Sequence, residues 1–209
     1  MHQFAPETHI IRKIWGKADT ILLIFAGSAA EFALNKAVDW LYFTGRIPAD
    51  PIGRLFSTVS YARRIIFDTE KAAFATIDSI NQIHGHVEKA RGISIPQWAF
   101  RDVLYMLIHY SIAAFEVLER KLTDAEKQAV YETFHKLGTR MQISGLPETY
   151  DQWCISYKQH QAKDLAYSPL TADLFVQYKK HLGPVRYRIL LESQKLVLPT
   201  IPARLLQLD

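Results

Sequence analysis

The chain has 209 residues, of which 49% are hydrophobic and 22% are charged, as is typical of a folded globular protein. Its formal net charge of +4 is spread along the sequence in short basic pairs such as Lys179–Lys180, which argues against a nucleic-acid binder. The single cysteine, Cys154, cannot form an internal disulfide, and the longest uncharged stretch is too short to cross a bilayer. We therefore expect a cytoplasmic protein without a signal peptide or transmembrane segment, for which peripheral membrane contact stays open.

Apolar residues recur at helical spacing, and the first expected element is a long helix over residues 19–43. This segment is apolar almost all round, which is typical of a helix at the centre of a core. A break is expected over residues 45–51. Asp50 is a good N-cap and Pro51 suits the first helical turn, so a second helix should begin there and end near residue 67.

Asp68 is the expected N-cap of a third helix, which runs to about residue 89. His84 falls on the apolar stripe of this helix, between Ile80 and Val87. Further helices are expected over about residues 98–120, 123–138, 149–166, 171–183 and 184–198. Their boundaries rest on a capping box that begins at Thr123, on caps at Thr149 or Asp151 and at Thr171, and on the Gly183–Pro184 break.

No segment shows the clean alternation of a strand bounded by hairpin turns. The sequence therefore predicts an all-α protein with about eight helices. We expect an N-terminal extension over residues 1–17, followed by a single globular helical domain over residues 18–209.

Arg54 and Thr58 are four residues apart on the second expected helix, so their side chains share one face. Arginine keeps its charge and donates through a fixed fork, and the threonine hydroxyl both donates and accepts. Such a pair could hold an anion or an oxygen species. A simpler interpretation is also open, in which Arg54 makes a surface ion pair and Thr58 is an ordinary helix residue.

His84 and His109 both lie in apolar helical segments, where a neutral imidazole needs a hydrogen-bond partner or a metal. A core histidine bonded to a carbonyl would satisfy the same pattern. His84 and His86 form a poor metal pair, because residues two apart on a helix point about 200° apart. Cys154 has no base beside it in the sequence, which is typical of an inert buried thiol.

Several motifs occur in order along the chain. Residues 50–55, followed by Thr58, have the pattern D-P-x-x-R-L-x-x-T, and residues 84–87 have the pattern H-x-x-V. The segments Leu107–His109 and Leu146–Tyr150 are similar to the patterns W-V-H and L-P-x-T-Y. This ordered set resembles the haem-dependent rubber oxygenase (latex-clearing protein) and MpaB family.

The resemblance implies a globin-like helical core around haem b, with His84 as the proximal iron ligand. It places Arg54 and Thr58 on the distal side, where dioxygen binds, and gives His109 a supporting role at the haem site. Rubber oxygenases carry a catalytic glutamate upstream of the distal arginine, and the nearest carboxylate here is that of Asp39. The implied substrate is apolar, isoprenoid or lipid-like, and a recombinant preparation can lack the haem.

Two other functions stay open at this stage. One is a non-catalytic helical module that binds a lipid or a partner protein and has kept only the fold. The other is a non-haem metal enzyme that uses His84, His109 and a carboxylate such as Asp39 or Asp102.

Overall fold

Two strongly apolar helices, α2 (Ala18–Leu34) and α7 (Gln97–Leu118), pack against each other at the centre of the protein and supply most of its core. The computed structural model describes residues 2–43 and 49–208. Within these ranges the side chains of Leu41, Pro51, Ile52, Arg54, Leu55 and Phe56 lie outside the described part. The expected break over residues 45–51 therefore falls largely outside the described residues.

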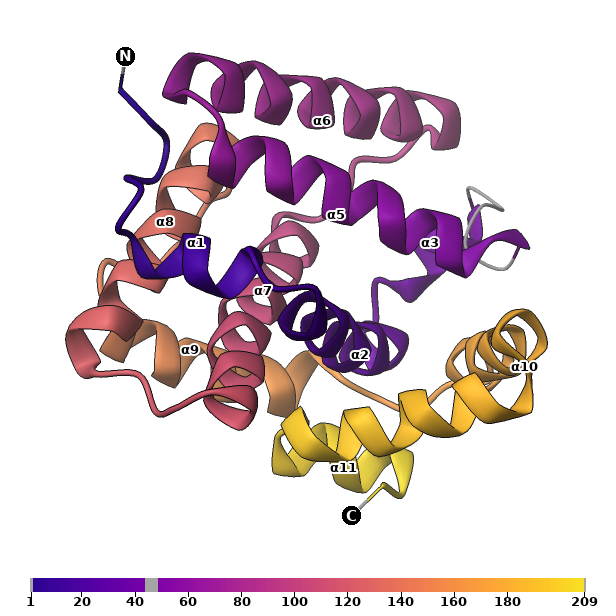
Figure 1. The fold of residues 1–209 in the computed structure, drawn as a ribbon. Coiled ribbons are helices and arrows are strands. Elements are labelled where there is room, and N and C mark those ends of the chain that lie inside the picture. Colours follow the sequence, from indigo (N-terminus) through magenta and orange to yellow (C-terminus); the bar gives the residue numbers. More distant parts are fainter. Residues whose placement is uncertain (1, 44–48, 209) are drawn as a thin grey trace.

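The described residues form ten helices and no strand, which confirms the prediction of an all-α fold. The other helices are α1 (Ile10–Trp15), α3 (Val38–Phe43), α5 (Pro51–Phe67), α6 (Glu70–Arg91), α8 (Asp124–Arg140), α9 (Tyr150–Asp164), α10 (Pro169–Val197) and α11 (Thr200–Leu206). α5 and α6 lie on one side of the central helices, whereas α10 and α11 lie on the opposite side (Figure 1). None of the helices within residues 2–43 and 49–208 is long and apolar enough to cross a membrane.

Several helix boundaries follow the local signals in the sequence. Asp50 caps α5 by accepting a hydrogen bond from the backbone N–H of Gly53 at 2.8 Å. Thr123 and Glu126 form the expected capping box at the start of α8. Gly183 interrupts α10 with a φ of 73°, a left-handed value that glycine adopts without steric cost.

The expected single helix over residues 19–43 is wrong, because the chain breaks at Asn35 into α2 and α3. The backbone of Asn35 is extended and forms a short antiparallel bridge with Leu165. Its side chain accepts a hydrogen bond from the N–H of Ala37 and donates one to Asp102. The break therefore has a tertiary cause, because it ties the end of α2 to α7 and to the end of α9.

Other boundary predictions need smaller corrections. Thr69, not Asp68, caps α6, and Ser168, not Thr171, caps α10, with Thr171 completing the capping box from inside the helix. Gly138 lies inside α8 rather than at its end. The segment expected as an extension contains α1, whose Trp15 is fully buried and donates a hydrogen bond to Ser111 of α7.

The close packing of α2 on α7 predicts a large effect for Gly27→Ala. A Cβ atom at Gly27 would lie 2.3 Å from ring carbons of Tyr110 and 2.9 Å from Val197. We expect the free energy of unfolding to fall by about 1–3 kcal/mol, measured by chemical denaturation, because the core must shift to admit the methyl group.

Gly85→Ala is the matched control, because a Cβ atom at this position in α6 would meet no heavy atom within 4 Å. Alanine there should raise the free energy of unfolding by about 0.5–1 kcal/mol through the lower entropy of the unfolded chain. Equal effects of the two substitutions would contradict the packing described here.

Candidate functional site

The predicted site residues Arg54, Thr58 and His84 lie on two helices that form an antiparallel pair. α5 and α6 pack together and are joined by only Asp68 and Thr69. Position 54 lies 14 residues before Asp68 and position 84 lies 15 residues after Thr69, so both are at about the same level along the pair. The side chain of Arg54 lies outside the described part. That it shares one site with His84 therefore stays a prediction.

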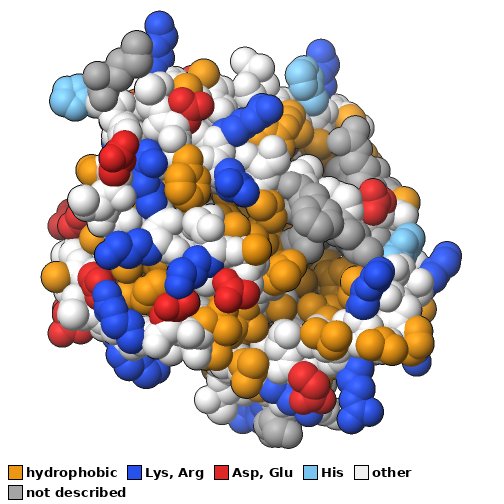
Figure 2. All heavy atoms as spheres, viewed as in Figure 1, with side chains coloured by type: hydrophobic (Ala, Val, Ile, Leu, Met, Phe, Trp, Pro, Cys, Tyr) orange, Lys and Arg blue, Asp and Glu red, His pale blue; other side chains and the backbone are white. Residues whose placement is uncertain are grey.

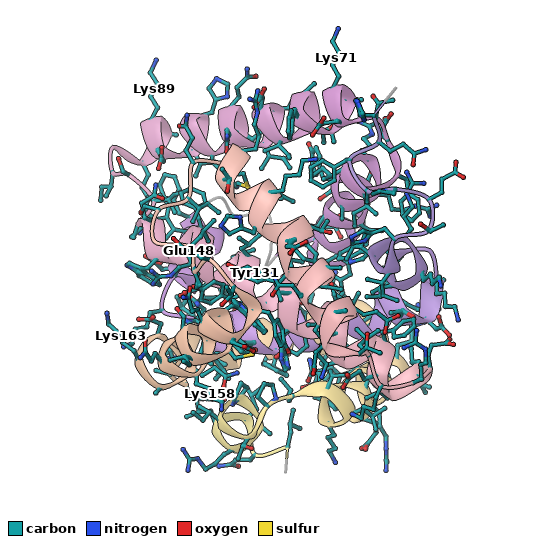
Figure 3. All side chains as sticks on the ribbon, turned by 90° about the vertical axis from the view of Figure 1, so that its left-hand side faces the viewer. Lys71, Lys89, Tyr131, Glu148, Lys158 and Lys163 are labelled. Atoms are coloured by element: carbon teal, nitrogen blue, oxygen red, sulfur yellow. The ribbon has the colours of Figure 1, made fainter. Side chains whose placement is uncertain are left out.

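His84 lies in the half of α6 that the rest of the protein covers least. Ala73 and Ile77, on the same stripe, are fully buried, whereas His84 is half-buried and Ile83 is 39% exposed. The ring of His84 packs against Phe100 of α7, with 5.0 Å between the ring centroids. Lysine side chains near the two ends of α6, at positions 71 and 89, point away from the protein (Figure 3).

Asp39 of α3 makes an ion pair with Arg91, the last residue of α6. Its carboxylate lies 2.7 Å from the guanidinium of Arg91, which also stacks over the ring of Trp40 at 3.9 Å. The Asp39 side chain is 45% exposed, and Arg91 follows His84 by about two helical turns. The structure therefore places this carboxylate in a solvent-accessible ion pair rather than in contact with His84.

His109 lies on the other side of α7. It follows Phe100 by nine residues, or about two and a half turns, so the two side chains point to opposite faces of the helix. The His109 ring packs against Tyr157 and Tyr110, with centroids 5.0 and 4.8 Å away. Burial lowers the pKa of His109 and favours the neutral imidazole. The structure therefore separates His109 from His84.

A second group of polar residues, of which the sequence analysis named only Asp102, lies inside the core next to His109. This buried polar cluster consists of Glu31 on α2, Asp102 on α7, and His160 and Asp164 on α9. Nδ1 of His160 lies 3.0 Å from Asp102 Oδ2 and 3.5 Å from Asp164 Oδ2. Nε2 of the same ring lies 3.5 Å from Glu31 Oε1. The exposed fraction of each of the four residues is 8% or less.

Two tyrosine hydroxyls complete the surroundings of Glu31. Tyr110 and Tyr157 each donate a hydrogen bond to Glu31 Oε2 at 2.7 Å. Burial and the neighbouring Glu31 carboxylate raise the pKa of both tyrosines, which keeps them protonated as donors. Burial alone would lower the pKa of His160, but its contacts with Asp102 and Glu31 outweigh burial and raise that pKa to about 9.

Residues 14–207 match the family model described as ER-bound oxygenase mpaB/B'/Rubber oxygenase, catalytic domain. The chain belongs to this oxygenase family. No curated protein and no solved structure matched the chain. The match spans every helix from α2 to α11, so this mpaB/rubber oxygenase domain includes both the α5–α6 pair and the buried polar cluster.

Part of the buried polar cluster of this oxygenase-family domain could be read from the sequence. His160 and Asp164 are four residues apart on α9 and therefore share a face, while Lys158 and Lys163 of the same helix point outward (Figure 3). Glu31 is an isolated charge in the most apolar helix, which is a sign of a buried polar contact. Nothing local indicates that these helices meet, because Glu31 and Tyr157 are 126 residues apart.

The contacts of Glu31 predict that Tyr157→Phe will destabilise this oxygenase-family domain. The substitution keeps the ring stacked between Trp153 and His160 but removes one donor from a fully buried carboxylate. We expect the free energy of unfolding to fall by about 1.5–3 kcal/mol, the usual range for a hydrogen bond to a charged group.

Tyr167→Phe is the control, because that residue is 57% exposed and its substitution should change stability by less than about 0.5 kcal/mol. Both variants can be measured by denaturant unfolding in the same buffer. A Tyr157→Phe protein as stable as the control would show that Glu31 does not need this donor.

Proposed function

We propose that this protein is a haem b-dependent oxygenase that acts with dioxygen on an apolar, isoprenoid or lipid-like substrate. Its membership of the mpaB/rubber oxygenase family supports an oxygenase activity. The haem assignment rests on one observation. His84 on α6 lies at about the same level along the helix pair as the segment of α5 that bears Arg54 and Thr58. An imidazole on one helix and an Arg–Thr pair on its neighbour are the residue types that a haem–dioxygen site uses.

The residues present around His84 fit a haem. Its imidazole is half-buried against the ring of Phe100, which restricts the orientation of the imidazole. Gly85 adjoins it and is exposed, with no heavy atom within 4 Å of its Cβ position, so this residue does not crowd the imidazole. His84 would hold the iron, and the hydroxyl of Thr58 and the charge of Arg54 would orient bound oxygen. When bound, haem supplies the oxygen chemistry, while these side chains position and polarise it.

Exposed apolar side chains support an apolar substrate. Val185, Ile189 and Leu196 are 60–72% exposed along the second half of α10, where they line a shallow groove. Hydrophobic side chains also gather in a hollow between α2 and α10 on the face shown in Figure 2. Such surfaces are suited to deliver a hydrocarbon chain or to contact the membrane in which it is dissolved.

Haem uptake is the first test of this proposal. The haem-free protein should take up about one haem per chain with a sharp Soret band, and His84→Ala should abolish that uptake because it removes the axial ligand. His86→Ala is the matched control, because His86 is exposed on the same helix and should leave uptake unchanged. A chain that binds no haem specifically would overturn the proposal in favour of a non-catalytic lipid- or partner-binding module. Stoichiometric haem in His84→Ala would remove only the ligand assignment.

Arg54→Ala tests the oxygen side of the site. The variant should keep its Soret band but lose about 10²-fold or more of its oxygen consumption with an emulsified isoprenoid hydrocarbon such as squalene, because a fixed positive charge is gone. Arg64→Ala, at an exposed position further along α5, should keep full activity. If the two variants consume oxygen equally fast, Arg54 has no role in the reaction.

A further inference from the structure

The buried polar cluster contains more carboxyl groups than basic side chains. Glu31, Asp102 and Asp164 are three carboxylates, and their partners in the described part of the chain are His160, Asn35, Tyr110 and Tyr157. No lysine or arginine is among those partners, so at most one imidazolium faces three carboxylates. Charges this far from water are stable only when they are paired or bound to a metal.

The cluster also contains polar atoms that make no hydrogen bond. Asp102 Oδ1 and Glu31 Oε1 are fully buried and have no hydrogen-bond partner in the described part of the chain. Both ring nitrogens of His160, a residue only 3% exposed, lie 3.0–3.5 Å from carboxylate oxygens without the alignment that a hydrogen bond requires. The two ring nitrogens of His160 therefore face carboxylate oxygens at short range without a hydrogen bond, as ligands around a cation would.

We propose that Asp102, His160 and Asp164 bind one divalent transition-metal ion, of which Zn²⁺ fits best. Their three donor atoms all lie within 4.8 Å of one another. Two ligands of a tetrahedral zinc at about 2.0–2.1 Å are separated by about 3.3–3.4 Å. The spacings of 3.0 and 3.5 Å from His160 Nδ1 to the two aspartate oxygens bracket that value.

Glu31 serves this site through the other nitrogen of the histidine. Its Oε1 lies 3.5 Å from His160 Nε2, and its negative charge favours the proton on that nitrogen, which leaves the lone pair of Nδ1 for the metal. Asn35 donates to Asp102 Oδ2 and fixes that carboxylate. The ion would join α7 to α9 and, through Glu31 and Asn35, to α2. The ion would therefore lie inside the core, separate from the His84 side of α7.

The test uses the 209-residue chain without added haem, stripped of metals with a chelator and then incubated with Zn²⁺. We expect it to retain about one Zn²⁺ per chain after gel filtration, measured by elemental analysis, with a higher melting temperature than the stripped protein. Co²⁺ in the same site should give visible absorption bands of a low-coordinate ion. Asp164→Asn should lower zinc affinity by at least about 10–100-fold, because it removes the charge of a ligand.

Two control variants separate this site from other metal-binding places. Asp151→Asn changes an exposed carboxylate on the same helix and should retain one zinc. The double variant His84→Ala/His86→Ala should also retain one zinc, which rules out these two histidines of α6. Circular dichroism identifies any variant that fails to fold, and His160→Gln is then the second ligand variant.

The proposal is overturned if the unsubstituted protein retains no zinc and shows the same melting temperature with and without it. It is also overturned if a folded Asp164→Asn protein keeps its zinc while the His84→Ala/His86→Ala protein loses it. These outcomes are independent of the oxygenase proposal. A protein that takes up haem but no zinc contradicts only the metal site, and the reverse result contradicts only the haem site.

Discussion

The carboxylate of Glu31 is the constraint around which the core is organised. It lies fully buried in the most apolar helix of the protein, where an ionised group is stable only if donors surround it. Tyr110 from α7 and Tyr157 from α9 both supply such donors to one oxygen. Gly27 precedes Glu31 by one helical turn on the same face and leaves room for the Tyr110 ring. The spacing of Gly27 and Glu31 thus sets how closely α7 approaches α2.

The proposed haem residues lie outside the frame formed by α2, α7 and α9 around Glu31. α5 and α6 pack mainly on each other and on the edge of the core, and His84 reaches the frame through the ring of Phe100. The other face of α7 carries His109, which packs on the two tyrosines that bind Glu31. One helix therefore separates a half-buried histidine from a fully buried charged cluster, so a substitution on one side can be interpreted without a large effect on the other.

Local signals in the sequence were sufficient for most helices and for several of their ends. Asp50, Thr123 and Gly183 act through their own backbone and nearest neighbours, which is why they could be interpreted without the fold. The break at Asn35 could not be predicted, because its partners are Asp102 and Leu165, far away in the chain. The apolar stripe of α6 correctly gave the inner face of that helix. It could not show that the neighbouring helices stop covering the stripe near His84.

The two histidines for which we propose ligands differ in how far the core covers them. His160 is enclosed by carboxylates and aromatic rings in a packed core, which leaves no room for a macrocycle. His84 is half-buried beside Phe100, and no heavy atom lies within 4 Å of the Cβ position of the neighbouring Gly85. A fully buried His84, as periodicity alone suggested, would have required the core to open before haem could bind. The two histidines therefore differ in packing: His84 lies at the edge of the core, whereas His160 lies inside it.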